Sequence, residues 1–452
     1  MTVNEKRSVF TLALLYAMRM LGLFMVLPVF ILLGDDLEGA NGLLIGFAIG
    51  AYGLTQALFQ VPFGMLSDRI GRKKMIVFGL LIFCVGSVVA ATSETIYGVI
   101  AGRLLQGAGA IASVLMALLS DLTTEESRTK AMAVVGMSIG LSFSVALVLG
   151  PIVSAYFGLN GIFWLTAVFA LMGIAIVIFI VPTPVSTHGH RDTRAVRGEF
   201  FELLKNKDLL RLDIGIFILH LILTALFIAV PLSLVNDIQL ARQEHWWVYL
   251  SVMVLAFFAM VPFIIIGEKK RKIKIIFVGA IMLLSVGSLL LVWGQSSLLA
   301  IWVALFVFFM AFNLLEASLP SLVSKQAPAG ARGTAMGIYS TSQFFGAFLG
   351  GVIGGWVIST WGAETIYYGS AILALIWGLI ALSMRPPSYS TSRMLRLNCL
   401  LSEAEAETVS DELFDIQGVE DVVVVIEEQT AYLKVDKAHL DETALMTYRY
   451  TE

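Results

Sequence analysis

The stretch GMLSDRIGRKK, Gly64–Lys74, joins two long apolar runs and places one carboxylate, Asp68, among four cations. The four cations are Arg69, Arg72, Lys73 and Lys74. Gly64 and Gly71 permit a close approach of helices and a tight reversal of the chain. Asp68 can cap a helix or pair with Arg72. We therefore predict a latch that holds two helices together in one conformation and releases them in another; an ordinary basic turn is the alternative.

The composition around this stretch is that of a membrane protein. The 452 residues are 58% hydrophobic and only 14% charged, and the mean hydropathy is +0.87, which lies outside the range of soluble globular proteins. The lysines and arginines cluster between apolar runs, so no nucleic-acid partner is expected. Two cysteines and no nucleophile, metal cluster or phosphate loop predict that the chain is not an enzyme and has no cofactor or metal.

Apolar segments long enough to cross a bilayer recur along the chain, because a spanning helix needs about 20 apolar residues. We predict twelve spans, at 9–33, 42–63, 74–92, 95–119, 130–155, 159–182, 210–234, 246–267, 273–294, 297–322, 331–356 and 363–384. The turns between them alternate between basic and acidic. By the positive-inside rule, both termini face the cytoplasm.

The membrane part divides into two six-helix halves. A polar linker at 183–209 separates the half at 1–182 from the half at 210–385, and its segment 199–207 predicts a short surface helix. The two halves resemble each other at an offset of 204, with Arg128–Gly140 aligned on Arg332–Phe344. Parallel repeats of this kind are one architecture of secondary transporters; a chance match of glycine-rich helices is the alternative.

A small soluble domain follows the second half. After a Pro- and Ser-rich linker at 386–393, residues 394–452 predict the order strand, helix, strand, strand, helix, a ferredoxin-like pattern in the cytoplasm. Its helix at 402–417 is acidic, with Ser402 as candidate N-cap. The helix can dock on the basic segment Lys269–Lys274, bind a ligand or join two copies as a homodimer.

Four ionisable residues lie well inside the predicted spans: Arg19, Arg103, His220 and Glu316. A charge at the bilayer centre costs about 2.5–3.5 kcal/mol even on lenient scales, so such residues usually face a cavity and each other. Glu316 is the one carboxylate among them and is the candidate proton carrier, with Arg103 as the group that tunes it. His220 is a relay or a satisfied core histidine; Arg19 makes a structural helix-to-helix bond or a substrate contact.

Several uncharged side chains are candidates for the lining of a substrate cavity. Asn313 lies one turn before Glu316 and shares its helix face. The remaining candidates are Gln106, Phe24, Met25, Phe227, Phe312 and Phe344. For the aromatic residues and Met25, packing between helices or against lipid is an equal alternative.

The latch stretch resembles motif A of the major facilitator superfamily, in the position that the family gives it between the second and third helices. RLLQGAGAIA at Arg103–Ala112 resembles the family's motif B, and LGLFMVLP at Leu21–Pro28 resembles a motif of its drug and proton antiporters. The fifth-helix antiporter motif is partial: Gly150 and Pro151 are present, but Ala146 replaces a glycine.

The whole chain resembles the YajR-type subgroup of that family, twelve-helix facilitators with a small cytoplasmic ferredoxin-like domain. The resemblance implies a relay in which Gly64, Asp68 and Arg72 interact with Asp121 at the end of the fourth helix.

These observations lead to the hypothesis of a proton-coupled secondary transporter in a bacterial inner membrane. It would export small, drug-like molecules by alternating access, and its partners would be protons, a small-molecule substrate and the lipid bilayer. Two alternatives remain: a proton-coupled importer of a metabolite, and a transporter-like sensor that signals through the C-terminal domain.

Overall fold

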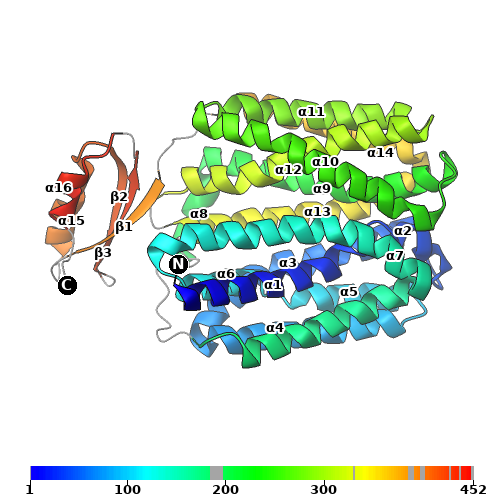
Figure 1. The fold of residues 1–452 in the computed structure, drawn as a ribbon, viewed down its shortest axis with the longest axis horizontal. Coiled ribbons are helices and arrows are strands. Elements are labelled where there is room, and N and C mark those ends of the chain that lie inside the picture. Colours follow the sequence, from blue (N-terminus) through cyan, green and yellow to red (C-terminus); the bar gives the residue numbers. More distant parts are fainter. Residues whose placement is uncertain are drawn as a thin grey trace.

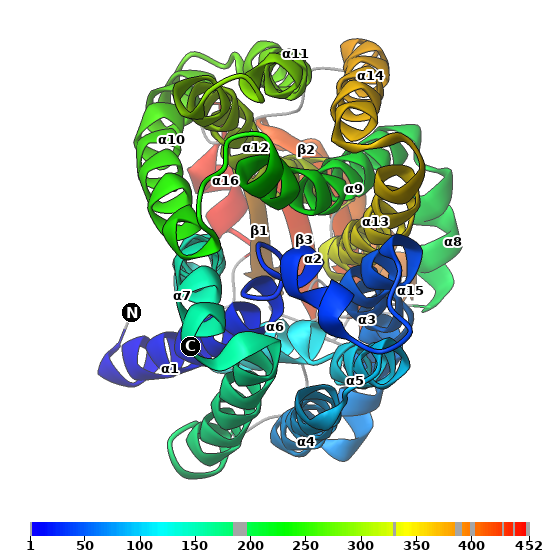
Figure 2. The same cartoon turned by 90° about the vertical axis from the view of Figure 1, so that its right-hand side faces the viewer.

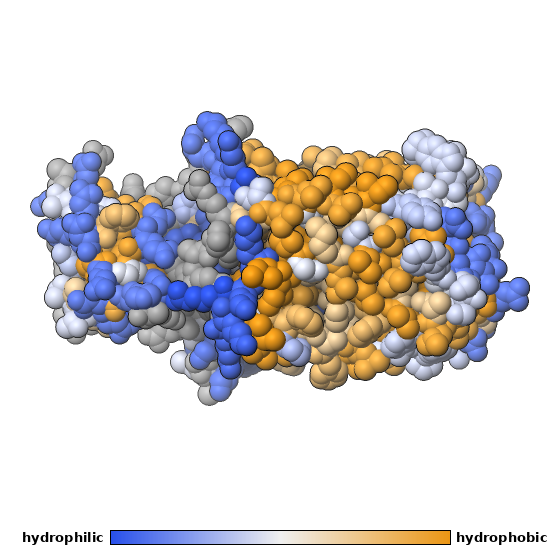
Figure 3. All heavy atoms as spheres, turned by 90° about the horizontal axis from the view of Figure 1, so that it is seen from above, coloured by the Kyte–Doolittle hydropathy of each residue, from blue (hydrophilic) through white to orange (hydrophobic). Residues whose placement is uncertain are grey.

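Long helices run side by side, and a small α+β domain lies beyond one end of them (Figure 1). The computed structural model describes residues 2–183, 197–328, 331–384, 391–397, 403–426, 429–436 and 439–448. We call the end of the helix bundle that carries the small domain the domain end, and the opposite end the far end. On the face seen in Figure 3, a hydrophobic band lies between hydrophilic surfaces at the two ends of the bundle, as expected for a protein that spans a bilayer.

The predicted twelve-span membrane fold is confirmed. Within the described residues, eleven helical segments are long and apolar enough to cross a membrane, and one of them contains two spans, because Gly158 has φ 65° and breaks it at the far end. The spans are α1 (Val3–Phe24), α3 (Gly42–Ile70), α4 (Arg72–Thr92), α5 (Ile96–Ala108) with α6 (Ala112–Asp121), α7 (Glu125–Phe179, two spans), α9 (Lys207–Asn236), α10 (His245–Lys269), α11 (Ile273–Gly294), α12 (Leu298–Gln326), α13 (Arg332–Trp361) and α14 (Ala363–Leu382). A surface helix, α8 (Arg197–Lys205), precedes α9.

Two spans differ from the continuous helices that were expected. The first, expected over 9–33, ends at Phe24 and continues after a turn as α2 (Phe30–Leu33), since Pro28 cannot donate a backbone hydrogen bond. The fourth, expected over 95–119, breaks between α5 and α6 at Gly109. A side chain at Gly109 would come within 2.3 Å of the Gly79 carbonyl, so the break lies where α4 crosses in backbone contact.

The two halves meet where α3 packs against α13 and where α7 packs against α10 (Figure 2). At the far end the α3–α13 seam is closed by backbone contact, because a Cβ on Gly46 would lie 2.2 Å from the Gly351 carbonyl. Toward the domain end, a Cβ on Gly337 would meet only Val61, at 3.8 Å. The seam is therefore sealed at the far end and looser toward the domain end.

The C-terminal domain has the predicted order of elements, β1 (Thr391–Arg396), α15 (Glu403–Phe414), β2 (Val419–Val425), β3 (Thr430–Val435) and α16 (Glu442–Met446). The sheet is antiparallel with the order β1-β3-β2, and Leu413 of α15 is buried against it. The first strand begins at Thr391, three residues before the expected start. The expected N-cap Ser402 lies outside the described residues.

Contacts of Lys434 and Asp436 are among those that tie this domain to the second half of the bundle. Lys434 of β3 donates to the Lys325 carbonyl at the end of α12, at 2.6 Å. Arg271, in the turn between α10 and α11, lies 3.4 Å from an Asp436 oxygen just after β3. The basic segment thus meets Asp436, just after β3. Docking of the acidic helix at 402–417 on this segment was one of three possible roles, and it stays a prediction.

Candidate functional site

Arg72 is the centre of an ion-pair network at the domain end. It opens α4 and is only 4% exposed. Its Nε lies 3.1 Å from Asp121 Oδ2 at the end of α6, and its Nη1 pairs with Asp68 and donates to Ser67 Oγ, both in the last turns of α3. One buried guanidinium therefore joins the ends of α3, α4 and α6, and its several donors suit that geometry better than a point charge.

The two glycines of the stretch have different roles. Gly71 separates α3 from α4 with φ 101° and ψ 139°, a conformation that L side chains rarely adopt. Apart from its neighbours along the chain, no atom of the described residues lies within 4 Å of its Cβ position. The turn therefore requires a glycine for its backbone conformation. Gly64 faces α6, since its Cβ would meet Ser113 Oγ at 3.2 Å. Arg69 is exposed and lies outside the Arg72 network.

Two further contacts at the domain end were not predicted. Glu5 of α1 accepts hydrogen bonds from the Thr124 amide and hydroxyl, at 2.7 and 2.8 Å, and so caps the start of α7 from another helix. Lys73 donates to the Val181 carbonyl after α7, at 2.7 Å. Glu5 and Thr124 are 119 residues apart, and no local pattern in the sequence connects them.

The first half buries two arginines among neutral groups. Arg19 donates to Gln56 Oε1 at 2.6 Å and to the Gly109 carbonyl at 3.1 Å. Arg103 donates to Gln106 Oε1 at 2.9 Å and to two carbonyls of α3 at 3.3 Å. The Tyr52 ring lies 5.9 and 5.4 Å from the two guanidinium carbons. In the described residues, neutral acceptors and a ring face, and no carboxylate, surround these permanent charges.

The second half brings together Glu316 of α12, His220 of α9 and a residue that sequence reasoning missed, Gln343 of α13. Gln343 Nε2 lies 2.8 Å from His220 Nε2 and 3.2 Å from Glu316 Oε1. His220 Nε2 and Glu316 Oε2 are 3.8 Å apart. One amide group therefore faces both titratable groups, and it can donate one hydrogen to each when His220 is neutral and carries its hydrogen on Nδ1.

This cluster keeps unused hydrogen-bonding capacity. Asn313 Nδ2, Glu316 Oε2 and the Tyr339 hydroxyl are buried without a hydrogen-bond partner among the described residues. Yet about a third of the Glu316 side chain stays exposed. Buried polar atoms without partners are rare and demand an explanation such as a bound proton, water or ligand.

Asp213 of α9 is a second carboxylate in this half, beside Glu316, and it was not predicted as a site residue. It is 7% exposed and lies seven residues before His220, on the same helix face. The signal was present in the sequence, because Asp213 lies inside the span expected over 210–234. The helix begins at Lys207, so Asp213 is nearly two turns inside it.

The aromatic candidates form a seal between the halves. Phe143 of α7 contacts Phe24, Phe227 and Phe312, with ring centroids 5.0, 6.1 and 6.0 Å apart. Met25 is fully buried. In this conformation these residues, among those the structure describes, close the space between α1, α7, α9 and α12.

Comparison with known proteins places this geometry among transporters. Residues 12–351 and 212–398 match the model of the Major Facilitator Superfamily. The inner membrane transport protein YajR of Escherichia coli K12 is 47% identical over 437 residues, which are 96% of this chain and 95% of that protein. Multidrug resistance protein 2 of Bacillus subtilis 168 is 23% identical over 370 residues, 78% of this chain and 90% of that protein. The crystal structure of the human organic anion transporter MFSD10 (TETRAN) has a TM-score of 0.64 and 19% identity, covers 84% of this chain and 100% of that one, and shares the fold.

Proposed function

The chain belongs to the major facilitator superfamily of membrane transporters, and we propose that it is a proton-coupled exporter of small, drug-like molecules that works by alternating access. That the chain is a transporter and not an enzyme follows from the family and from the transport proteins that it matches. The names of the relatives support an inner membrane location and drug-like substrates. Both termini would then face the cytoplasm, because the basic turns gather at the domain end.

The observation that carries the proposal is the Gln343 amide between His220 and Glu316. Protonation of His220 would place a second donor against the amide nitrogen, so the amide must turn and release Glu316. Protonation of Glu316 removes the charge that the amide stabilises. Each protonation step therefore changes contacts between α9, α12 and α13, and a conformational change can be driven only by such differential contacts.

Motif A would act as the conformational switch of the first half. Arg72 joins Asp68, in the last turn of α3, to Asp121 at the end of α6. Gly71 allows the turn, and Gly64 allows the close approach of α6. Breaking the Arg72 pairs frees α6 from this turn, while exposed Arg69 attracts anionic lipid headgroups. Arg103, bonded to α3 carbonyls, would supply the fixed charge that tunes the proton site. Arg19, bonded to Gln56 and the Gly109 carbonyl, would have a structural role, and the neutral Gln106 and Asn313 would be polar contacts for substrate.

We propose that the C-terminal domain steadies the second half at the domain end. Its Lys434 and Asp436 join the end of α12 and the α10–α11 turn. These are the second-half counterparts of the α6 end and the α3–α4 turn that Arg72 joins in the first half. The domain therefore occupies the place of a second latch. Dimerisation through its surface stays an alternative role.

The test is proton flux in proteoliposomes that hold a pH gradient, with a panel of cationic drugs and small metabolites. We expect at least one compound to collapse the gradient with the wild-type protein and not with Glu316→Gln. Glu364→Gln is the matched control, because Glu364 is exposed at the far end of α14.

Equal proton flux in Glu316→Gln and wild type would contradict Glu316 as the proton carrier. Compounds that move protons only when presented outside right-side-out vesicles would favour the metabolite importer. Binding of a compound with no proton movement in either protein would favour the sensor.

A further inference from the structure

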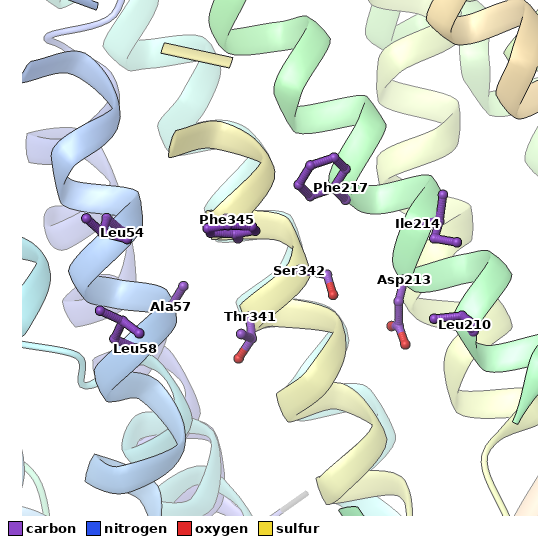
Figure 4. A pocket seen from close by; sticks show the side chains of 10 residues that line it. All are labelled: Leu54, Ala57, Leu58, Leu210, Asp213, Ile214, Phe217, Thr341, Ser342 and Phe345. Atoms are coloured by element: carbon purple, nitrogen blue, oxygen red, sulfur yellow. The ribbon is translucent and has the colours of Figure 1, made fainter. Parts of the chain in front are cut away.

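A groove opens on the side of the bundle where the two halves meet, toward the domain end of the α3–α13 seam. It has a volume of about 370 Å³, within the range of small-molecule sites. Helix α13 forms its middle, and α3 and α9 form its sides (Figure 4). Leu58 and Phe345 at its edge are 61% and 42% exposed, in the apolar band that faces lipid.

The groove begins where the glycine contacts of the seam end. A Cβ on Gly53 would lie 2.5 Å from the Phe344 carbonyl, whereas Leu54 and Phe345, the next residues on each helix, already line the groove. Its depth therefore depends on how far α3 and α13 separate toward the domain end. It is a feature of the conformation that is sealed at the far end.

The polar groups of the groove are those of a cation site. Asp213 lines the groove from α9 and is only 7% exposed. It has no ion pair or hydrogen bond to other described residues. Ser342 faces Asp213 across the groove, and Thr341, whose Oγ1 is buried without a hydrogen-bond partner, points toward α3 (Figure 4). The other lining residues are apolar.

We propose that this groove binds a lipophilic organic ammonium ion that enters from the membrane, with its charge at Asp213 and its apolar body against α3 and Phe217. An isolated carboxylate within a membrane span is costly unless a cation or a proton meets it. A phosphate group would be repelled by the same carboxylate. The proposal names the substrate class and the entry route of the transporter, and in this it rests on the proposed function.

The groove and the proton-coupling cluster are neighbours on α13. Ser342 lines the groove, and the next residue, Gln343, contacts Glu316. Tyr339 lies one helical turn before both, and its hydroxyl is buried without a hydrogen-bond partner among the described residues.

The test is equilibrium binding to the full chain in phosphatidylglycerol nanodiscs. The probes are a tritiated 4-phenylbutyl-trimethylammonium ion and its uncharged isostere, in which tert-butyl replaces the ammonium group. We expect the cation to bind wild type at least tenfold tighter than the isostere, and Asp213→Asn to lose that preference. Asp208→Asn, near the start of the same helix and paired with Arg211, is the control that keeps it. Ala57→Phe, which places a large side chain in the groove, should abolish binding of both probes.

Unchanged cation binding in Asp213→Asn, or equal binding of the two probes, would overturn the proposal. Loss of cation binding when phosphatidylethanolamine replaces part of the lipid would overturn it in favour of the lipid amine as the occupant. Glu316→Gln separates this proposal from the proposed function: it should keep cation binding while it loses proton flux. If cation binding depends on Asp213 but proton flux is unaltered in Glu316→Gln, the cation site in the groove is supported and Glu316 is rejected as the proton carrier.

Discussion

The two halves of the bundle differ in the ionisable side chains that they hold inside their spans, away from the ion pairs at the helix ends. The first half buries Arg19 and Arg103 among amides and carbonyls, and these permanent charges do not titrate. The second half holds the buried side chains of Asp213 and His220 and the partly exposed side chain of Glu316, and these are groups that can titrate. The halves also differ at the domain end, where one turn is held from within by Arg72 and the other by the C-terminal domain.

This difference suggests a division of labour between the halves. A permanent charge supplies a constant potential, whereas a titratable group changes its contacts when it gains or loses a proton. The first half would therefore contribute a fixed field and a conformational latch. The second half would contribute the proton-dependent change, next to a groove that opens at the seam between the halves.

The largest expected effect on the free energy of unfolding comes from breaking the contacts of Arg72 with Asp68 and Asp121. Arg72→Ala removes the guanidinium from Asp121, whose side chain is only 4% exposed, and we expect a loss of about 3 kcal/mol in the free energy of unfolding. Arg69→Ala, three residues away and exposed, should change it by less than about 0.5 kcal/mol. Unfolding in mixed detergent and dodecyl sulfate micelles measures both. Similar losses in the two variants would show that the stretch is an ordinary basic turn.

A smaller effect is expected from the turn itself. Gly71→Ala forces a Cβ into a conformation with φ 101°, which costs about 2 kcal/mol, although nothing crowds the position. Gly136→Ala, also with free space around its Cβ position but inside helix α7, should stabilise by about 0.5 kcal/mol. The same unfolding measurement compares the pair. Equal effects would mean that the backbone of the latch turn is not constrained.

The smallest effect on the free energy of unfolding is expected at the pair of Arg271 and Asp436, which joins the C-terminal domain to the second half. Arg271 is half exposed, so Asp436→Asn should cost less than about 1 kcal/mol. Hydrogen exchange of the amides in the α10–α11 turn should nevertheless become a few times faster, because the domain no longer holds the turn. Lys270→Ala, exposed in the same turn, is the control. Unchanged exchange in Asp436→Asn would show that the domain does not restrain this turn.

Local signals predicted much of this structure. Apolar run lengths gave the twelve spans, and strand and turn residues gave the order of the C-terminal domain. The Asp68–Arg72 pair is one helical turn apart, whereas the contact of Arg72 with Asp121 was implied only by a family resemblance. Gln343 and the cap that Glu5 makes on α7 could not be predicted, because they depend on how distant helices pack. The breaks at Pro28 and Gly109 were missed because the apolar composition continues across them.

The proton site is assigned to the second half of the bundle, at Glu316. Infrared difference spectra of the protein between acid and alkaline buffer report on such a site, since a carboxyl group that titrates inside the protein contributes a protonated carbonyl band. We expect Glu316→Gln to remove a component of this band, and Asp213→Asn and Glu364→Gln to retain that component. An unchanged band in Glu316→Gln would show that the proton is carried elsewhere.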